Sequence, residues 1–277
     1  MLLPTSHGTV TIQEFLERYQ HSAVSRGLRP RSIADISKCL RRVAREIEAR
    51  RLADLTPAAL QGWIGECGLK PVRLQSVVKN AACAFSKPSL QALGMGEVQN
   101  PFLHLVRPKV DREPFRAPPR AWITGLMRQG IKELQGEVRL AFVLGLGAGL
   151  RWGEISSLTW EEVQGGCIGV AAAKAKGRRA RSVPIGPKIR AVVESGRGRG
   201  PVIAGDAEEV HATLCAWLRG CGVQDAKPVH YLRKCFGSLA VADHGIFIAS
   251  KLLGHASIGI TASTYAGQVD RLPALRF

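Results

Sequence analysis

The amino-acid sequence predicts a mainly α-helical protein with a small β-sheet, organised as two domains. The first hundred residues repeat apolar side chains at the spacing of amphipathic helices. Residues 100–120 then contain five prolines, seven charged residues and no sustained apolar period, which is typical of an interdomain linker. Two short strand-like runs surround a basic turn within a second, mainly helical region. We therefore expect one domain over 1–107, a linker over 108–120 and a second domain over 121–277.

Four helices are expected in the first domain. The first covers 11–24, with Thr9 or Thr11 as its N-terminal cap. The second carries isoleucine, leucine and valine along one side, and arginine and lysine on its other faces. The third begins with Thr56 as a cap and Pro57 at the first helical position. The second to fourth helices are expected over 29–50, 54–67 and 76–94.

The second domain is expected to alternate helices with one small hairpin. Residues 121–150 (AWITGLMRQGIKELQGEVRLAFVLGLGAGL) predict two helices. Residues 167–186 (CIGVAAAKAKGRRARSVPIG) predict two short strands joined by a basic turn. Helices dominate again from about residue 206 to Tyr265. The sequence contains no internal repeat.

Charge is the strongest bulk property of the chain. Its formal net charge is +17, with arginine more frequent than lysine. Residues 1–112 contribute 17 basic against 9 acidic residues, and residues 113–277 contribute 22 against 13, so both halves are basic. A basic tail would place this charge at one end. Two basic halves instead favour a protein that faces a polyanion such as DNA or RNA with both halves.

Several classes of protein are disfavoured by the sequence. The first residues, MLLPTSHGTV, lack the basic and apolar regions of a signal peptide, and no apolar run approaches the ~20 residues of a membrane span. Seven scattered cysteines without a CxxC pair indicate neither a disulfide framework nor a zinc site. The sequence contains no cluster of carboxylates that would indicate a metal site. We expect a cytoplasmic protein with reduced thiols and neither metal nor cofactor.

Four segments carry residues capable of phosphate chemistry. GAGLRWGEISSLTW places an arginine at the start of an amphipathic helix, with Glu154 one turn on as its partner. AKAKGRRARSVPIG offers two lysines, VHYLRKCFGSL places a histidine and an arginine on one helical face, and KLLGHASIGITASTY ends on one of only three tyrosines. Taken singly, each segment has an ordinary structural explanation, as a capped helix, a basic loop or a core side chain. The candidate residues are Arg151, Lys174 or Lys176, His230, Arg233, His255 and Tyr265.

Together, and in this order, the four segments resemble the tyrosine recombinases, the phage integrase family. The first and third segments are similar to that family's two arginine boxes, the second to its GKG…R.VP hairpin and the last to its LLGH and tyrosine motif. The match to VPIG places the family's lysine at Lys176 rather than Lys174. The resemblance implies a helical core-binding (SAM-like) DNA-binding domain over 1–107 and a mixed α/β catalytic domain over 121–277.

The resemblance also implies a role for each residue in cutting DNA without metal or ATP. Tyrosine would be the nucleophile that stores the broken bond as a 3′-phosphotyrosine ester. The arginines would offset charge on the transition state, the first histidine would act as general base, the lysine would protonate the leaving 5′ oxygen, and the second histidine would donate to the phosphate. The nucleophile would be Tyr265 and the two arginines Arg151 and Arg233. The general base would be His230, the lysine Lys176, and the second histidine His255.

Three functions fit these motifs. The first is a site-specific recombinase or integrase of a mobile element, working as a homotetramer on double-stranded DNA that contains specific recombination sites, with an accessory DNA-bending or directionality protein as a further partner. The second is a type IB topoisomerase-like enzyme that relaxes DNA. The third is a non-catalytic DNA-binding regulator with the same fold. The compact helical first half favours the recombinase, and no membrane partner is expected.

Two features near the C-terminus lead to further expectations. The interval from His255 to Tyr265 is one residue longer than in the commonest family members. One extra residue turns a helical side chain by about 100°, so we expect the small, polar run 261–264 to form a loop that absorbs it. The apolar residues Leu272, Leu275 and Phe277 are expected to dock on a neighbouring protomer within the DNA-bound tetramer, and the alternative is that they fold back onto their own domain.

Overall fold

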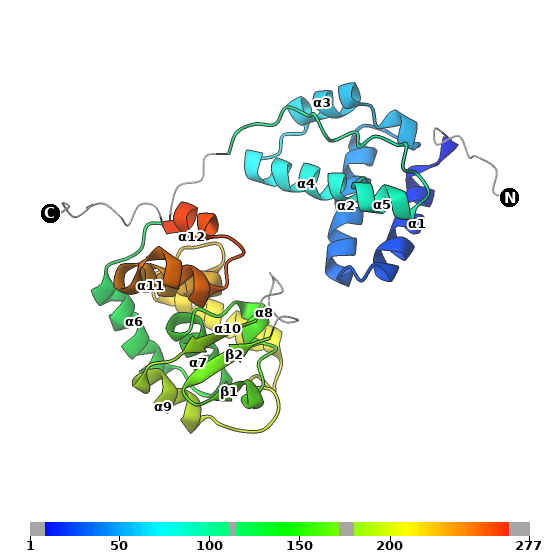
Figure 1. Cartoon of the computed structure of the whole chain (residues 1–277). Helices are drawn as coiled ribbons and strands as arrows, with labels where there is room; N and C mark the ends of the chain where they lie inside the picture. The colour runs from blue at the N-terminus through cyan, green and yellow to red at the C-terminus, as the bar shows by residue number, and fades with distance from the viewer. Residues whose placement is uncertain (1–8, 111–114, 172–179, 266–277) are drawn as a thin grey trace, which may run out of the picture. The chain divides into compact units, whose positions relative to one another are not determined.

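The computed structural model describes residues 9–110, 115–171 and 180–265. The chain divides into two compact units, Met1–Arg112 and Glu113–Phe277 (Figure 1). Each unit has its own hydrophobic core. The mainly helical architecture with a small sheet is confirmed. Three predictions from the sequence lie outside the described residues: the position of Lys176, that of Lys174, and the docking of the C-terminal tail.

The first unit is entirely helical in its described part. Predicted caps begin two of its helices: Thr11 forms a reciprocal capping box with Glu14, and the Thr56 hydroxyl accepts from the Ala59 N–H. The second helix packs against the fourth and is the centre of this core. The helices are α1 (Ile12–Ser25), α2 (Pro30–Glu46), α3 (Pro57–Glu66), α4 (Pro71–Ala84) and α5 (Lys87–Ala92), with a 3₁₀ turn at Leu52–Asp54.

The helical pattern predicted over 76–94 is present but interrupted. The helical pattern there belongs to two helices, because the chain leaves helical geometry at Phe85 and Ser86 before α5 starts. Pro88 in the first turn of α5 cannot donate the hydrogen bond that would continue α4. The break also allows the Phe85 ring to stack on Phe15 at a centroid distance of 4.8 Å, which closes the core of the first unit.

The second unit surrounds one buried helix. The α7 sequence, GEVRLAFVLGLG, is apolar on all sides, and every residue from Leu140 to Leu146 is buried. Helices α6, α9, α10 and α11 pack against it. The helices are α6 (Arg120–Glu133), α7 (Gly136–Gly147), α8 (Trp152–Ile155), α9 (Pro187–Ser195), α10 (Ala207–Gly220), α11 (Pro228–Leu253) and α12 (Ile258–Tyr265), with a 3₁₀ turn at Trp160–Glu162.

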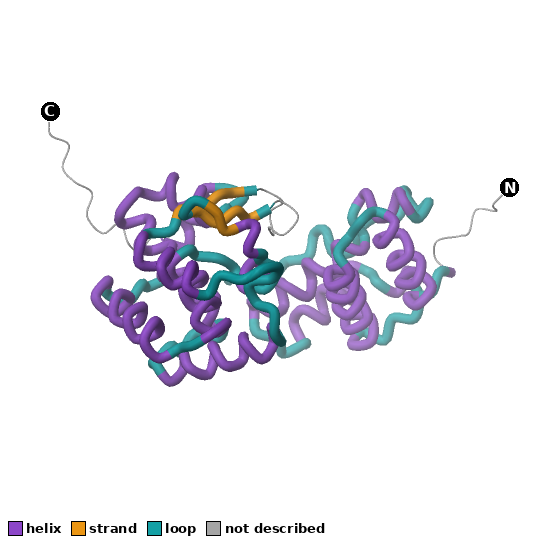
Figure 2. The backbone as a smooth tube through the Cα atoms, turned by 90° about the horizontal axis from the view of Figure 1, so that it is seen from below, coloured by secondary structure: helices purple, strands orange, loops and turns teal. Residues whose placement is uncertain are grey.

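The predicted strand pair forms, and a third strand joins it. Strands β1 (Val163–Gln164), β2 (Cys167–Val170) and β3 (Arg181–Pro184) form an antiparallel sheet in the order β1-β2-β3 (Figure 2). Cys167 pairs with Pro184, and Val170 pairs with Arg181. β1 is only two residues long, too short to give an alternating pattern in the sequence.

Helix α11 corrects the expectation that no apolar run approaches the length of a membrane span. By length and composition it could cross a membrane, with a mean hydropathy of 1.3 over its best window. However, Gly245 lies inside it with φ 76° and ψ 168°, so two helices meet there at a kink. The longer part, 228–244, also packs on α7 and α10. Leu232 and Cys235 in this part are fully buried, whereas Phe247 and Ile248 after the kink are exposed.

Candidate active site

Five of the six predicted site residues line one pocket of about 430 Å³. The pocket lies where the start of α8, the first part of α11 and the last helix, α12, meet. Arg151 comes from the first of these elements, His230 and Arg233 from the second, and His255 and Tyr265 from the chain after α11. Segments more than one hundred residues apart in the sequence therefore converge. The sixth predicted residue, Lys176, lies outside the described part of the chain.

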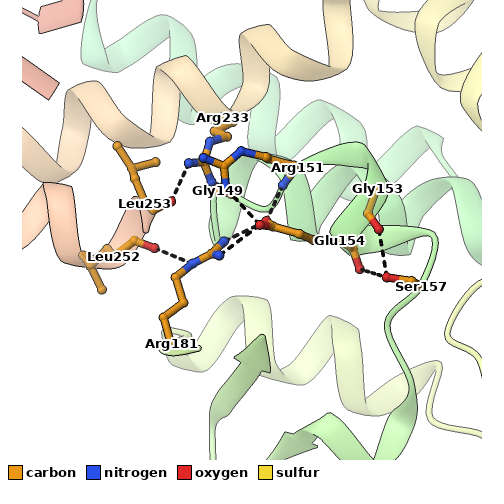
Figure 3. Close-up of polar contacts among 9 residues, drawn as sticks. All are labelled: Gly149, Arg151, Gly153, Glu154, Ser157, Arg181, Arg233, Leu252 and Leu253. Atoms are coloured by element: carbon orange, nitrogen blue, oxygen red, sulfur yellow. Dashed lines mark hydrogen bonds and ion pairs between the residues drawn. The ribbon is translucent and has the colours of Figure 1, made fainter. Parts of the chain in front are cut away.

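Glu154 holds two arginines at the edge of this pocket (Figure 3). Arg151 is the N-terminal cap of α8, and both its main-chain N–H and its Nη1 donate to Glu154, at 2.8 and 2.9 Å. Arg181 donates through Nη1 and Nη2 to the two oxygens of the same carboxylate, at 3.0 and 2.7 Å. Burial alone would raise the pKa of Glu154, but the hydrogen bonds from Arg181 and from the Arg151 N–H lower it to about 2. The carboxylate is therefore ionised.

Arg181 is a residue that sequence reasoning missed. It was part of a run interpreted as a basic turn, whereas the structure places it in β3 with only 6% of its side chain exposed. Its Nε also donates to the Leu252 carbonyl at 3.0 Å, which ties the sheet to the end of α11. The available signal was strand alternation: Arg181 is two residues before the buried Val183 and so lies on the same face of the strand.

Arg233 is the most deeply buried charge of the pocket, at 2% exposure. Its Nη1 and Nη2 donate to the main-chain carbonyls of Gly149 and Leu253 (Figure 3). Burial, with the neighbouring Arg151 cation, lowers the pKa of Arg233 to about 9. Within the described residues its hydrogen-bond partners are thus carbonyl oxygens and not a carboxylate. Arg151 and Arg181 pair with one glutamate and Arg233 with carbonyls, so the site has an excess of positive charge suited to an anion.

Both predicted histidines are neutral near pH 7. The His230 side chain is exposed at the pocket mouth, but partial desolvation and then the cations Arg233 and Lys234 lower its pKa to about 4. Burial and the neighbouring arginines likewise lower the pKa of His255 to about 4. A neutral imidazole has one acceptor nitrogen and one donor N–H. Each ring can therefore accept a proton or donate a hydrogen bond to an anion.

His255 follows Gly254, the left-handed residue that ends α11, and its Nδ1 lies 2.7 Å from the hydroxyl of Thr261. Thr261 is completely buried. The hydroxyl can donate to Nδ1 or accept from it, so this hydrogen bond holds the ring in place and leaves Nε2 without a part in the contact.

We expect Thr261→Val to release this control of the His255 ring. Valine matches threonine in shape but has no hydroxyl, so Nδ1 loses its partner and the balance between the two tautomers of the neutral imidazole should differ from that of the wild type. Nitrogen-15 NMR of labelled histidine measures the two forms directly. Thr261→Ser, which keeps the hydroxyl, is the matched control. An unchanged balance of tautomers in Thr261→Val would contradict the prediction.

Tyr265 is the last residue of α12 and is 3% exposed. Its hydroxyl rests against the main chain of α11 at Gly237, where a Cβ would lie 2.0 Å from Oη. Only glycine leaves room for the hydroxyl in this position. Burial raises the pKa of Tyr265 to about 12, although Arg233 acts in the opposite direction. The phenol is therefore protonated, and it needs a base to react as a nucleophile.

The expected loop at 261–264 is wrong, because these residues are helical within α12. The non-helical residues instead come earlier, between Gly254 and Ile258. A turn there can adjust the phase of the following helix, which leaves Thr261 free to be buried beside His255. The extra residue between His255 and Tyr265 thus requires no break next to the tyrosine.

Comparison with models of protein families identifies the family to which this chain belongs. The model of the phage integrase family matches residues 126–271, more than half of the chain. The chain belongs to the phage integrase family. No curated protein sequence matches this integrase-family chain.

Solved structures share the fold at low sequence identity. A lambda integrase dimer bound to a COC′ core site is 18% identical, with a TM-score of 0.70 over 98% of this chain and 81% of that one. A lambda integrase (75–356) dimer on the same kind of site has a TM-score of 0.71 at 18% identity, covering 96% and 99%. The Tn1549 transposon integrase in complex with transposon right end DNA has a TM-score of 0.67 at 16% identity, covering 92% and 95%. At these identities the likeness shows the fold of this integrase-family member.

Proposed function

We propose that this chain is a site-specific DNA recombinase that cuts and rejoins DNA through a 3′-phosphotyrosine intermediate, for integration or excision of a mobile element. One observation carries the proposal: Arg151, Arg233, two histidines and Tyr265 line one pocket, and Glu154 beside it already pairs with both Arg151 and Arg181. A DNA phosphate supplies the negative charge that this group lacks. The phenol supplies the nucleophile.

The arginines stabilise charge on the phosphate. Arg233 is fixed by two carbonyls and Arg151 by Glu154, so both guanidinium groups are oriented before DNA arrives. Pre-oriented donors need little reorganisation when charge develops on the nonbridging oxygens, and losing one such donor typically costs about 10²–10³ in rate. His255 adds a donor if Thr261 donates to Nδ1, since Nε2 then carries the proton.

Each cleavage exchanges one phosphate ester for another. Oη of Tyr265 attacks phosphorus while His230 takes the phenolic proton. The bond from phosphorus to the 5′ oxygen breaks, and Lys176 gives a proton to that oxygen. The products are a tyrosine 3′-phosphate ester and a free 5′ hydroxyl. Attack by a 5′ hydroxyl of the partner strand reverses these steps, returns the proton to Tyr265 and needs neither metal nor ATP.

We also propose that the first unit grips the duplex as a core-binding domain and that four copies assemble on two recombination sites. α2 supports this role, because its apolar side is buried while its other face exposes Arg31, Lys38, Arg41 and Arg45. Lambda integrase has been crystallised as a dimer on a core site and as a tetramer bound to a Holliday junction. An accessory DNA-bending or directionality protein would complete the assembly.

Trapping covalent adducts on DNA of many different sequences tests the proposed function. Supercoiled plasmids with random inserts, and others with the DNA that flanks the gene, are incubated with the protein in excess EDTA without ATP. Detergent then stops the reaction. We expect protein-linked DNA with one enriched sequence under these conditions, because the proposed exchange of phosphate esters needs neither metal nor ATP. A strict magnesium requirement for cleavage would contradict the mechanism.

The same reactions separate the two alternatives. Robust relaxation of every plasmid, without sequence preference, would indicate a topoisomerase-like enzyme. Tight duplex binding with no adduct on any plasmid would indicate a non-catalytic regulator.

A further inference from the structure

A residue of the predicted linker contacts the helix that carries Tyr265. The main-chain N–H of Phe115 donates to the carbonyl of Thr264 at 2.8 Å. Thr264 adjoins Tyr265 in the last described turn of α12. The segment before α6 therefore supplies a donor to this helix one residue from the candidate nucleophile.

The Phe115 side chain makes a second contact with α12, next to the first. Its ring meets Tyr265 edge to face, with a centroid distance of 6.3 Å and an interplanar angle of 86°. It meets Tyr231 of α11 in the same way, at 5.5 Å and 83°, and the ammonium of Lys234 lies 5.4 Å from its centroid. Phe115 thus lies between α11 and the phenol of Tyr265, with the edge-to-face geometry that aromatic pairs prefer.

These contacts are independent of the phosphate chemistry. Phe115 does not line the pocket that contains Arg151, Arg233 and Tyr265, and no step of the proposed cleavage uses it. Its contacts instead limit where the end of α12 can lie. They add to the packing of α12 on α11, where the Tyr265 hydroxyl rests against Gly237.

We propose that Phe115 is a positioning residue for Tyr265: it holds the last turn of α12 so that the phenol reaches the phosphate. This inference rests on the proposed function. It assigns the segment before α6 a role besides joining the two units. Because that segment continues from the DNA-gripping unit, the placement of Tyr265 depends on where the linker lies.

The test uses the full-length protein and two independent readouts. Phe115→Ala removes the ring but keeps the N–H, and Phe115→Tyr restores a ring. Arg116→Gln, at the exposed neighbouring residue, is the matched control for a change in the linker. The first readout is carbon-13 NMR of ring-labelled tyrosine without DNA, with the Tyr265 signal assigned through Tyr265→Phe. The second is the single-turnover rate of adduct formation on the site found by adduct trapping.

We expect Phe115→Ala to shift the Tyr265 signal and to slow adduct formation by about tenfold or more, since misplacing a nucleophile is costly. DNA affinity and melting temperature should change little, and Phe115→Tyr should recover most of the rate. A substrate with sulfur in place of the 5′ bridging oxygen, a better leaving group, should not rescue Phe115→Ala, because the defect lies in the nucleophile.

Two results would overturn the inference: an unshifted Tyr265 signal in Phe115→Ala, or an adduct rate within twofold of the wild type. If the wild-type protein itself cuts no DNA, the proposed function fails. The NMR readout then still decides whether Phe115 places Tyr265, so the two failures are distinguishable.

Discussion

Tyr265→Phe should abolish the covalent protein–DNA adduct. The substitution removes one oxygen from a side chain that is 3% exposed and leaves the ring in its place beside Phe115. Without Oη no phosphotyrosine ester can form, whereas the arginines that bind phosphate are untouched. We therefore expect no adduct on a nicked suicide duplex, with duplex affinity close to that of the wild type. Denaturing gels and a binding titration on the same DNA measure the two quantities.

Tyr231→Phe is the matched control for this experiment. Tyr231 contacts the same Phe115 ring, and burial raises its pKa to about 12, as for Tyr265. Only its position differs, since it is on α11 and does not line the pocket. Loss of the adduct in Tyr231→Phe, together with its survival in Tyr265→Phe, would show that the nucleophile is assigned to the wrong tyrosine.

Glu154→Gln should give the second large effect, on stability as well as on activity. Glu154 is 3% exposed and is the shared partner of Arg151 and Arg181. Removing one partner of a buried ion pair typically costs about 3–5 kcal/mol. The melting temperature of the second unit should fall by roughly 10 °C. Adduct formation below the melting range should also slow, because Arg151 loses the group that orients it.

Glu194→Gln is the control for the loss of a carboxylate. Glu194 pairs with Arg197 on the surface, with about 40% of each side chain exposed. Such pairs contribute at most about 1 kcal/mol, so its melting temperature should stay close to that of the wild type. Equal destabilisation by both substitutions would contradict the central role of Glu154.

Acid unfolding provides an independent measure of the same carboxylate. The pKa of Glu154 is about 2 in the folded protein against an ordinary value of 4.5. Its contribution to the free energy of unfolding is therefore complete above about pH 5 and is lost as pH falls from 4.5 to 2. The lowered pKa values of His230 and His255 add a loss between pH 6.5 and 4. The Glu154→Gln variant should keep the loss of stability that the histidines cause between pH 6.5 and 4. It should lack the further loss below pH 4.5 that the Glu154 carboxylate causes.

Local rules were sufficient for most of the fold and for much of the site. Thr11 and Thr56 begin helices as their side chains predict, because capping depends on residues within one turn. The partnership of Arg151 with Glu154 was predictable for the same reason, as three residues separate them. The convergence of Arg233 and Tyr265 on one pocket followed from the family motifs and not from any local pattern.

The errors arise where distant packing decides the outcome. Arg181 belongs to the site because of the register of β3 and the buried carboxylate across from it, neither of which a run of basic residues reveals. Residues 261–264 are helical because Thr261 gains a partner in His255. The contact of Phe115 with Tyr265 was equally hidden, since a segment rich in proline and charge predicts a connection and gives no sign of what it packs against.

The buried position of the Tyr265 hydroxyl against Gly237 has a consequence for DNA that contains no target site, which the protein should bind without cutting. A protein with a charge of +17 meets far more ordinary DNA than target sites. With a pKa of about 12, only roughly one in 10⁵ of these phenols is ionised at pH 7. Under the proposed mechanism, mere encounter with a duplex should therefore leave the strand intact. Damage would then be avoided by chemistry as well as by sequence recognition, because the proposed nucleophile reacts only beside a phosphate held by all its partners.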